Sequence, residues 1–429
     1  MSISSLLLVL SVLSLCLGKE SYFLLLSDIH YDPHYVELSA GGETGDWCRK
    51  HLPVPESSRA IFGRNECNPG MKLVESTITT IKTATPSPSF ILLAGDLASH
   101  ALYTEEEVIS VINDVTSLIA SSFPNVPIYS TIGNNDLFPS YQSIDLQALA
   151  KVWGPHFQSK EAFEQFSQTG YYKADIPGTQ MTLISINSVL YSPSHKNALS
   201  YFSAENSGST PDPLNQFEWL KNQLILTHKQ NRAVLLLTHI PPGNNEFRDG
   251  VLWQEFFTKK FVQIIELYGK HIIAQFYGHL HADDYRIVTS SHAPGFISAS
   301  VSPVYANNPA FRVVKFDSEQ SNLIDIDTYY MDLFTSNKEK YPHWYFEYSF
   351  KNLYSVPDLS ISSLTNLISK ISVNETYWNN FINSRSALFY PRRFAYVCAM
   401  KYMELSDFRK CLSENSDEYP LGRKRIGIF

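Results

Sequence analysis

Leu24-Leu25-Leu26-Ser27-Asp28-Ile29-His30 decides the fold, because this apolar run ends in a carboxylate and an imidazole and its pattern recurs along the chain. The other runs are Ile91-Leu92-Leu93-Ala94-Gly95-Asp96, Ser130-Thr131-Ile132-Gly133-Asn134, Leu235-Leu236-Leu237-Thr238-His239 and Phe276-Tyr277-Gly278-His279-Leu280-His281. Short apolar runs bounded by polar or turn residues predict buried β-strands. Ligands of α/β sheets bind beyond the carboxyl ends of the strands, so we expect these polar side chains to converge at one edge.

The converging side chains have the composition of a metal centre. They are Asp28, His30, Asp96, Asn134, His239, His279 and His281. Carboxylate, amide and imidazole donors without a thiolate suit zinc, manganese or iron. Two metal ions about 3.5–4 Å apart need a shared carboxylate, and we expect Asp96 to be that bridge. A glycine before Asp96, Asn134 and His279 would let the backbone turn tightly beside a ligand.

Each of these signals also has an ordinary structural interpretation. A single histidine at a strand end is more often a hydrogen-bonded structural residue, and an aspartate after a strand is usually a turn residue or a helix cap. All the strand ends occur in order here, each directly after an apolar run. The combination therefore favours the functional interpretation.

Strand-like runs alternate with helical patterns along most of the chain. The runs quoted above correspond to predicted strands at residues 22–26, 90–94, 128–132, 233–237 and 272–277. Further strands are expected at residues 171–176 and 181–187, as a meander, and at 286–289, 296–300 and 311–316. Helices are expected after Thr104, which forms a capping-box pattern with Glu107, and over residues 215–227. This alternation predicts an α/β fold of two stacked sheets flanked by helices.

The pattern changes near Pro342. Residues 342–357 are rich in aromatic side chains and look irregular, and short helices are expected at residues 364–371, 377–382 and 393–403. We therefore predict three parts. They are a signal peptide over residues 1–18, a catalytic domain over 19–341 and a small C-terminal helical subdomain with a polar tail over 342–429.

The N-terminal residues and the cysteines indicate an oxidising compartment. Residues 6–17 form an apolar run that is too short to span a bilayer and is followed by Gly18 and Lys19, as in a signal peptide. The cysteines after this leader form two local pairs, which favours the disulfides Cys48–Cys67 and Cys398–Cys411, with other pairings left open. Asn374-Glu375-Thr376 is a glycosylation sequon. We expect a secreted, luminal or lysosomal glycoprotein.

The charge balance narrows the class of partner. A formal net charge of −8 argues against a protein that binds a nucleic-acid duplex, which usually carries a basic face. It is typical of a protein that stays in solution. After the leader, the sequence has no segment apolar enough to predict a transmembrane helix.

The strand-end motifs resemble the signature of the calcineurin-like metallophosphoesterases. Within that superfamily the chain is similar to the acid sphingomyelinase-like phosphodiesterases. The closer similarity rests on His30-Tyr31-Asp32-Pro33, His239-Ile240-Pro241-Pro242-Gly243, Gln275-Phe276-Tyr277-Gly278-His279, Asn308-Pro309-Ala310-Phe311-Arg312 and the pair Cys398 and Cys411. The resemblance covers residues 22–348 well and the C-terminal helices loosely.

The resemblance implies a zinc-dependent phosphodiesterase that acts on sphingomyelin-type, phosphocholine or nucleotide substrates. One zinc ion would be held by Asp28, His30, Asp96 and His281, and the other by Asp96, Asn134, His239 and His279. A hydroxide between the two ions would attack the phosphorus atom. Phospholipids and nucleotide-type phosphates are therefore the expected partners.

Two further residues bear on the proton of the leaving group. The resemblance implies that His100 lies near the leaving group. The family motif usually continues Gly-Asn-His, and that histidine is the expected proton donor, but this chain has Asn135 in its place. Gly-Asn-Asn-Asp is similar to the motif of vacuolar endopolyphosphatases, so a nucleotide or polyphosphate hydrolase is the alternative enzyme. A catalytically silent binding protein that keeps its metals is an alternative of another class, although no predicted ligand is missing.

Overall fold

The structure is a computed structural model that describes most of the chain. The described residues are 20–39, 48–50, 55–206, 208, 211–246, 250–287, 293–387 and 392–415. The predicted signal peptide at residues 1–18 lies outside them. Within the described residues, every helix is too short or too polar to cross a membrane.

The first sheet contains the first three predicted strands. Its order is β14-β13-β12-β1-β2-β3. The strands are β1 (Glu20–Leu26), β2 (Ile91–Leu93), β3 (Ile128–Ser130), β12 (Ala310–Asp317), β13 (Asn322–Met331) and β14 (Trp344–Ser349). β1, β2 and β3 run parallel, so their carboxyl ends lie at one edge, while β12 to β14 extend the sheet in antiparallel fashion.

The second sheet repeats this parallel arrangement. Its order is β10-β11-β9-β6-β5-β4. The strands are β4 (Tyr172–Asp175), β5 (Met181–Ser185), β6 (Ala233–Leu237), β9 (Ile272–Tyr277), β10 (Asp284–Arg286) and β11 (Gly295–Ile297). β5, β6, β9 and β11 are parallel. A short hairpin pairs β7 (Asn244–Asn245) with β8 (Gly250–Val251).

The two sheets pack against each other through fully buried aromatic and aliphatic side chains. The ring of Phe23 in β1 stacks on Phe90 with 4.4 Å between centroids, and it meets Phe276 of β9 edge-on at 5.6 Å. All three side chains are buried. These runs are apolar on both faces because each sheet is covered on both sides, as is usual for parallel sheets. The predicted two-sheet α/β fold is thus confirmed.

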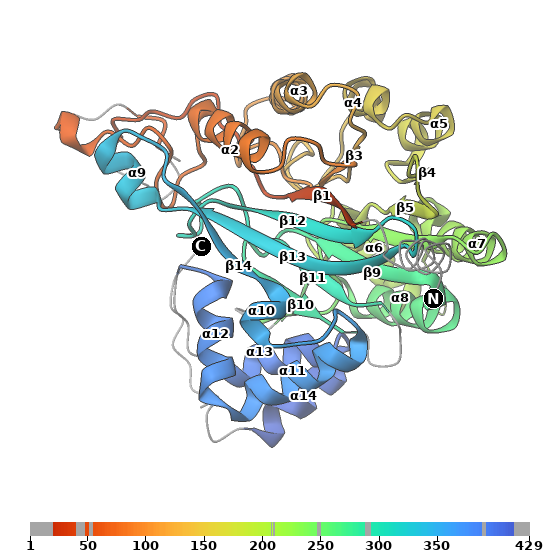
Figure 1. Ribbon diagram of the computed structural model, residues 1–429. Helices are drawn as coiled ribbons and strands as arrows, with labels where there is room; N and C mark the ends of the chain where they lie inside the picture. Colours follow the sequence, from red (N-terminus) through yellow and green to blue (C-terminus); the bar gives the residue numbers. More distant parts are fainter. Residues whose placement is uncertain are drawn as a thin grey trace, which may run out of the picture.

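Helices cover the two sheets on opposite sides (Figure 1). The helices up to the end of the second sheet are α2 (Met71–Ala84), α3 (Glu105–Ser122), α4 (Leu146–Trp153), α5 (Lys160–Thr169), α6 (Ala198–Asn206), α7 (Gln216–Lys229) and α8 (Glu255–Tyr268). The later ones are α9 (Leu333–Glu339), α10 (Phe350–Tyr354), α11 (Ile361–Val373), α12 (Glu375–Arg385), α13 (Arg393–Lys401) and α14 (Leu405–Glu414). In Figure 1, α2 to α5 lie above the sheets and α10 to α14 gather below them.

Most predicted elements are observed within a few residues of their expected bounds, and β6 and β9 match them fully. The strand expected at 286–289 shares only Arg286 with β10, which spans Asp284–Arg286, and residues 288–289 lie outside the described part. The capping box at α3 is only half formed. Thr104 accepts from the amide of Glu107, but the Glu107 carboxylate bonds the amide of Tyr103 and the imidazole of His34 instead.

The irregular segment expected at residues 342–357 was the main error. The structure places β14 and α10 there, and β13 was also missed. The aromatic residues of this segment are paired across strands, with Phe346 against Tyr329 at 5.5 Å and Tyr345 against Tyr330 at 5.8 Å. Such cross-strand pairs stabilise a sheet edge. The first sheet therefore continues past residue 341, and the domain boundary itself stays a prediction.

Both predicted disulfides are present. Cys48 bonds Cys67 with a Cα–Cα distance of 5.7 Å, and Cys398 bonds Cys411 with a distance of 5.8 Å. The sequon residue Asn374 is exposed and caps α12, because its side-chain oxygen accepts from the amides of Thr376 and Tyr377. This capping gives Asn374 a structural role whether or not it carries a glycan.

Candidate metal centre

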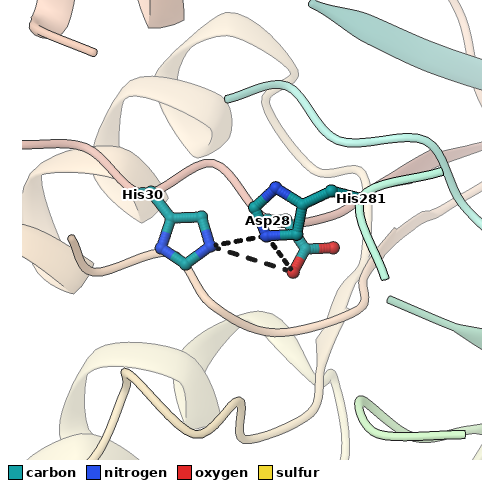
Figure 2. Close-up of side chains that lie close together, drawn as sticks. All are labelled: Asp28, His30 and His281. Carbon is teal, nitrogen blue, oxygen red and sulfur yellow. Dashed lines mark hydrogen bonds and ion pairs between the residues drawn. The ribbon is translucent and has the colours of Figure 1, made fainter. Parts of the chain in front are cut away.

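The seven side chains expected at the strand ends lie together where the carboxyl ends of the parallel strands of both sheets meet. Asp28 and His30 follow β1, Asp96 follows β2, and Asn134 follows β3. His239 follows β6, and both His279 and His281 follow β9. Two triads each offer donor atoms within 4.8 Å of one another. The triads are Asp28, His30 and His281 (Figure 2), and Asp96, His239 and His279.

One carboxylate oxygen faces both triads. Oδ2 of Asp96 lies 3.5 Å from Nε2 of His30 and 3.3 Å from Nε2 of His239. Asn134 joins the second triad, because its Oδ1 lies 3.2 Å from the same His239 nitrogen. This is the arrangement expected of a ligand that two metals share, with one metal on each side of it. Four imidazoles, two carboxylates and one amide oxygen suit two borderline divalent cations. The residues present therefore fit a centre of two metal ions.

The electrostatics of the two triads favour a cation. Burial raises the pKa of Asp28, but the neighbouring imidazoles of His281 and His239 together lower it to about 2. Burial also opposes ionisation of Asp96, and the His239 imidazole nevertheless holds the pKa of this carboxyl well below its usual range. Both carboxylates are therefore ionised at neutral pH, which is the state that binds metal ions.

The backbone at the centre is strained. Five of the seven residues have positive φ angles in the left-handed region. They are Asp28 (51°), His30 (48°), Asp96 (54°), His279 (72°) and His281 (53°). This conformation is uncommon for residues other than glycine, and it persists where the surrounding structure holds it in place, often at functional sites. The strain turns each side chain from the end of its strand into the common space.

Two glycines permit the close approach of these loops. A Cβ atom at Gly133 would overlap the amide and carboxylate of Asp96, and one at Gly278 would overlap the Ser27 hydroxyl. A larger residue at either position would push one loop away from the next. At the glycines before Asn134 and His279 the structure thus shows close approach of one strand end to another. Of the three glycines expected to allow a tight turn, Gly95 before Asp96 has a positive φ, of 87°.

Backbone carbonyls orient two of the histidines. Nδ1 of His30 lies 3.1 Å from the carbonyl oxygen of Ala98, and Nδ1 of His239 lies 2.7 Å from that of Ala94. Because a carbonyl oxygen can only accept, Nδ1 donates, and Nε2 is the atom that points into the centre. Asp28 is held in a similar way by the Ser27 hydroxyl at 2.6 Å and by the amide of His279.

Asp136 holds two of the strand-end loops together, and the sequence analysis missed it. One carboxylate oxygen accepts from the amides of Asp96 and Gly133 at 2.9 Å each. The other accepts from the amides of Leu97 and Ala98. The side chain is fully buried, and burial, with a contribution from Asp96, raises its pKa to about 6. The only sequence signal is that the run Gly-Asn-Asn ends in a carboxylate.

His100 lies beside the first triad. Its ring stacks on His30 with 4.4 Å between centroids, and its Nδ1 lies 2.8 Å from Oδ1 of Asn68. Its Nε2 lies 3.2 Å from the hydroxyl of Tyr305. Burial lowers the pKa of His100 to about 4, so the imidazole is neutral at pH 7.

The peptide that carries His100 is held by the region of the first disulfide. Arg49, next to Cys48, donates to the carbonyls of His100 at 3.0 Å and Ala101 at 2.7 Å. Asn68, next to Cys67, binds the imidazole itself. Neither contact is visible as a pattern in the sequence.

Asn135 faces the shared carboxylate. Its backbone amide donates to Oδ1 of Asp96 at 2.7 Å, and its side-chain amide donates to Oδ2 at 2.8 Å. Its own Oδ1 accepts from the Ser140 hydroxyl at 3.0 Å. Asn135 and His100 both line an open pocket of about 480 Å³ above the centre, together with Tyr141 and Tyr305. The structure thus brings together all nine residues that the sequence analysis selected.

Comparison with known proteins agrees with this architecture. Residues 21–283 match the calcineurin-like phosphoesterase family, and residues 287–418 match the acid sphingomyelin phosphodiesterase C-terminal region. Sphingomyelinase phosphodiesterase D of Dictyostelium discoideum is 28% identical over 85% of this chain and 83% of its own length. Human acid sphingomyelinase-like phosphodiesterase 3b is 28% identical over 90% of this chain and 89% of its own length. Human cyclic GMP-AMP phosphodiesterase is 26% identical over 91% of this chain and 89% of its own length.

The family match spans more than half of the chain and contains all seven strand-end residues. The C-terminal match covers β11 to α14 and so includes both the end of the first sheet and the helices beyond it. The chain therefore belongs to the calcineurin-like phosphoesterase family and, within it, to the acid sphingomyelinase-like phosphodiesterases.

Proposed function

We propose that this chain hydrolyses phosphodiesters at a centre of two divalent cations, with zinc as the expected metal. Asp28, His30 and His281 would hold one cation, and Asn134, His239 and His279 the other, with Asp96 shared between them. The observation that carries the proposal is the position of Asp96 Oδ2, which faces a histidine of each triad at the floor of a pocket. Two cations there would supply the positive charge that neutralises a phosphoryl group in its transition state and would activate water.

The residues of the chain would orient the substrate and handle the proton. Asn135 holds Asp96 through two hydrogen bonds, and Ser140 fixes the amide of Asn135. We assign the transfer of a proton to the leaving oxygen to His100, which lines the pocket beside Tyr305. Because burial lowers the pKa of His100 to about 4, the imidazole would carry that proton only in an acidic compartment. A positioned general acid of this kind typically contributes about 10²–10⁴ in rate.

Phosphodiesters of phospholipids or nucleotides are the proposed substrates. The relatives are named for sphingomyelin and for cyclic GMP-AMP, both of which contain phosphodiesters. We also propose an oxidising, secreted or luminal location, which two disulfides support because such bonds persist outside reducing compartments.

Asn135 favours a second candidate, a hydrolase of phosphoanhydrides. An asparagine amide cannot release a proton near neutral pH, and here it is engaged with Asp96. If no other group gives up a proton, substrates with good leaving groups, such as nucleoside triphosphates or polyphosphate, would be preferred over alkyl diesters. Whether His100 donates the proton to the leaving oxygen distinguishes the two candidate functions.

The test compares wild-type protein with Asn135→His and His100→Ala on an alkyl phosphodiester, an activated aryl phosphodiester and a nucleoside triphosphate. Asn113→His, an exposed change on α3, is the matched control. If His100 is the acid, His100→Ala abolishes alkyl-diester cleavage and Asn135→His gains nothing. If the acid is missing, Asn135→His gains on the alkyl diester alone. A wild-type protein that holds two metals and turns over none of these substrates, the activated ester included, would be a silent binding protein instead.

A further inference from the structure

His281 is oriented differently from the histidines beside it. Its Nδ1 is buried and has no hydrogen-bond partner in the described part of the chain, whereas carbonyls hold Nδ1 of His30 and His239. Its backbone also has the left-handed conformation, with φ of 53°. The ring packs against Tyr305 with 4.7 Å between centroids, but no partner at Nδ1 fixes its direction within the described residues. The main chain that carries the imidazole therefore contributes to its position.

The main chain at His281 is held from the C-terminal helical region. The side-chain amide of Asn307 donates to the carbonyl of His281. The hydroxyl of Ser386, the residue after α12, donates in turn to Oδ1 of Asn307 at 3.0 Å. The amide of Asp283 donates to the carbonyl of Arg385 at 2.8 Å. The end of α12 thus meets the loop directly after His281 once, at Asp283, and reaches the carbonyl of His281 a second time through Asn307.

A buried cluster of charges locks this end of α12 in place. Nε of Arg385 lies 3.2 Å from Asp284, and its Nη2 lies 2.5 Å from Glu246. Glu246 also binds Arg286 at 3.0 Å. All four side chains are almost completely buried, with exposed fractions of 3% or less. The cluster leaves α12 little freedom to move relative to the loop after β9.

We infer that the end of α12 is a positioning element for His281, acting through Ser386 and Asn307. The C-terminal helical region then sets the metal affinity of the Asp28, His30 and His281 position. At the other position, Asp136 holds the amide of Asp96 and the carbonyl of Ala94 holds Nδ1 of His239. The inference rests on the proposed metal centre and adds a role for a region that supplies no ligand.

The experiment is a Zn²⁺ titration of metal-free protein against a chromophoric chelator, with Ser386→Ala and Asn307→Ala. Removal of a partner that orients a ligand typically weakens metal binding about 10–100-fold. We expect Asn307→Ala to lower the Zn²⁺ affinity of one of the two sites by a factor within that range. Ser386→Ala should lower the affinity of the same site by a smaller factor. Ser384→Ala is the control, since its hydroxyl lies on the same helix but contacts the Tyr354 hydroxyl at 3.1 Å. Ser386→Thr keeps the hydroxyl and is expected to restore the affinity.

A second set of variants identifies the affected site. In a His281→Ala background, Ser386→Ala is expected to have no further effect, while in a His239→Ala background its effect persists, as for coupled and uncoupled pairs. Loss of affinity at both sites alike, or at neither, while thermal unfolding stays that of the wild type, overturns the inference. A wild-type protein that fails to bind two ions would instead refute the proposed function itself, so the two failures are distinguishable.

Discussion

The two triads of the candidate centre are built from different parts of the chain. The Asp96 triad is held by Asp136 and by the carbonyl of Ala94, and both lie in the α/β part. The Asp28 triad is completed by His281, whose loop is braced by Asn307 and by the end of α12. A ligand set that looks uniform in the sequence is thus supported in two ways, and the brace from Asn307 and Ser386 acts on the main chain of His281. The loop after His239 meets the C-terminal region further along, where Asn244 donates to the carbonyls of Tyr402 and Met403.

The largest expected effect removes the residue that the two triads share. Asp96→Ala should lose both metal ions and reduce hydrolysis of an activated aryl phosphodiester to background, because Oδ2 of Asp96 faces both sides. Elemental analysis of protein purified without chelator should find close to two metals per wild-type chain, mostly zinc, as expected for a two-metal site. Asp114→Ala, an exposed change on α3, should keep both ions. A metal-replete, active Asp96→Ala protein would end the proposal of a shared ligand.

Breaking the charge cluster at the end of α12 should lower the free energy of unfolding of the protein. Arg385→Met leaves Glu246 and Asp284 buried without this partner, and such a loss typically destabilises a protein by about 3–5 kcal/mol. Chemical unfolding measures the change in free energy. Lys259→Met is the control, because its exposed pair with Glu255 should contribute only about 0.3–0.5 kcal/mol. Equal stability of Arg385→Met and wild type would show that the cluster does not anchor α12.

Asp136→Asn should produce the opposite selectivity from Ser386→Ala. The carboxylate accepts from four backbone amides, and an asparagine would turn an NH₂ group toward two of them. We expect the Asp96 triad to lose metal affinity by about 10–100-fold while the Asp28 triad changes less. Zinc titration in the His239→Ala and His281→Ala backgrounds separates the two positions. Identical effects of Asp136→Asn and Ser386→Ala would remove the distinction between the triads.

The smallest contrast lies between the two disulfides. Replacing either pair with alanines should lower stability by about 3 kcal/mol on chain-entropy grounds, since the cysteines are 19 and 13 residues apart. Only the loss of Cys48–Cys67 should also lower kcat, because Arg49 and Asn68 beside it hold His100. Thermal unfolding together with kcat and KM below the unfolding temperature tests this. An equal drop in kcat for the Cys398–Cys411 variant would count against a specific link to His100.

The ligand set could be predicted because each of its members is local to a buried strand. Asp28 and His30 follow three consecutive leucines, and His239 follows another such run, so pattern and position coincide in a few residues. The aromatic strand β14 escaped prediction because its side chains are stabilised by pairing with β13, and this pairing leaves no local signal. Local patterns report burial and period, while cross-strand partners are chosen by the fold.

The sequence by itself determined the strands, the residues at their ends and the two local cysteine pairs, because each of these features is encoded within a few neighbouring residues. Only the tertiary structure decided what orients them. Asp136 reaches the amide of Asp96 across 40 residues, and Ser386 reaches Asn307 across 79. Asp136 bonds a backbone amide, which every residue except proline has, and serine and asparagine are common polar residues, so neither pair stands out in the sequence. Their specificity arises from the packing of the sheets and the C-terminal helices, so it exists only in the folded chain.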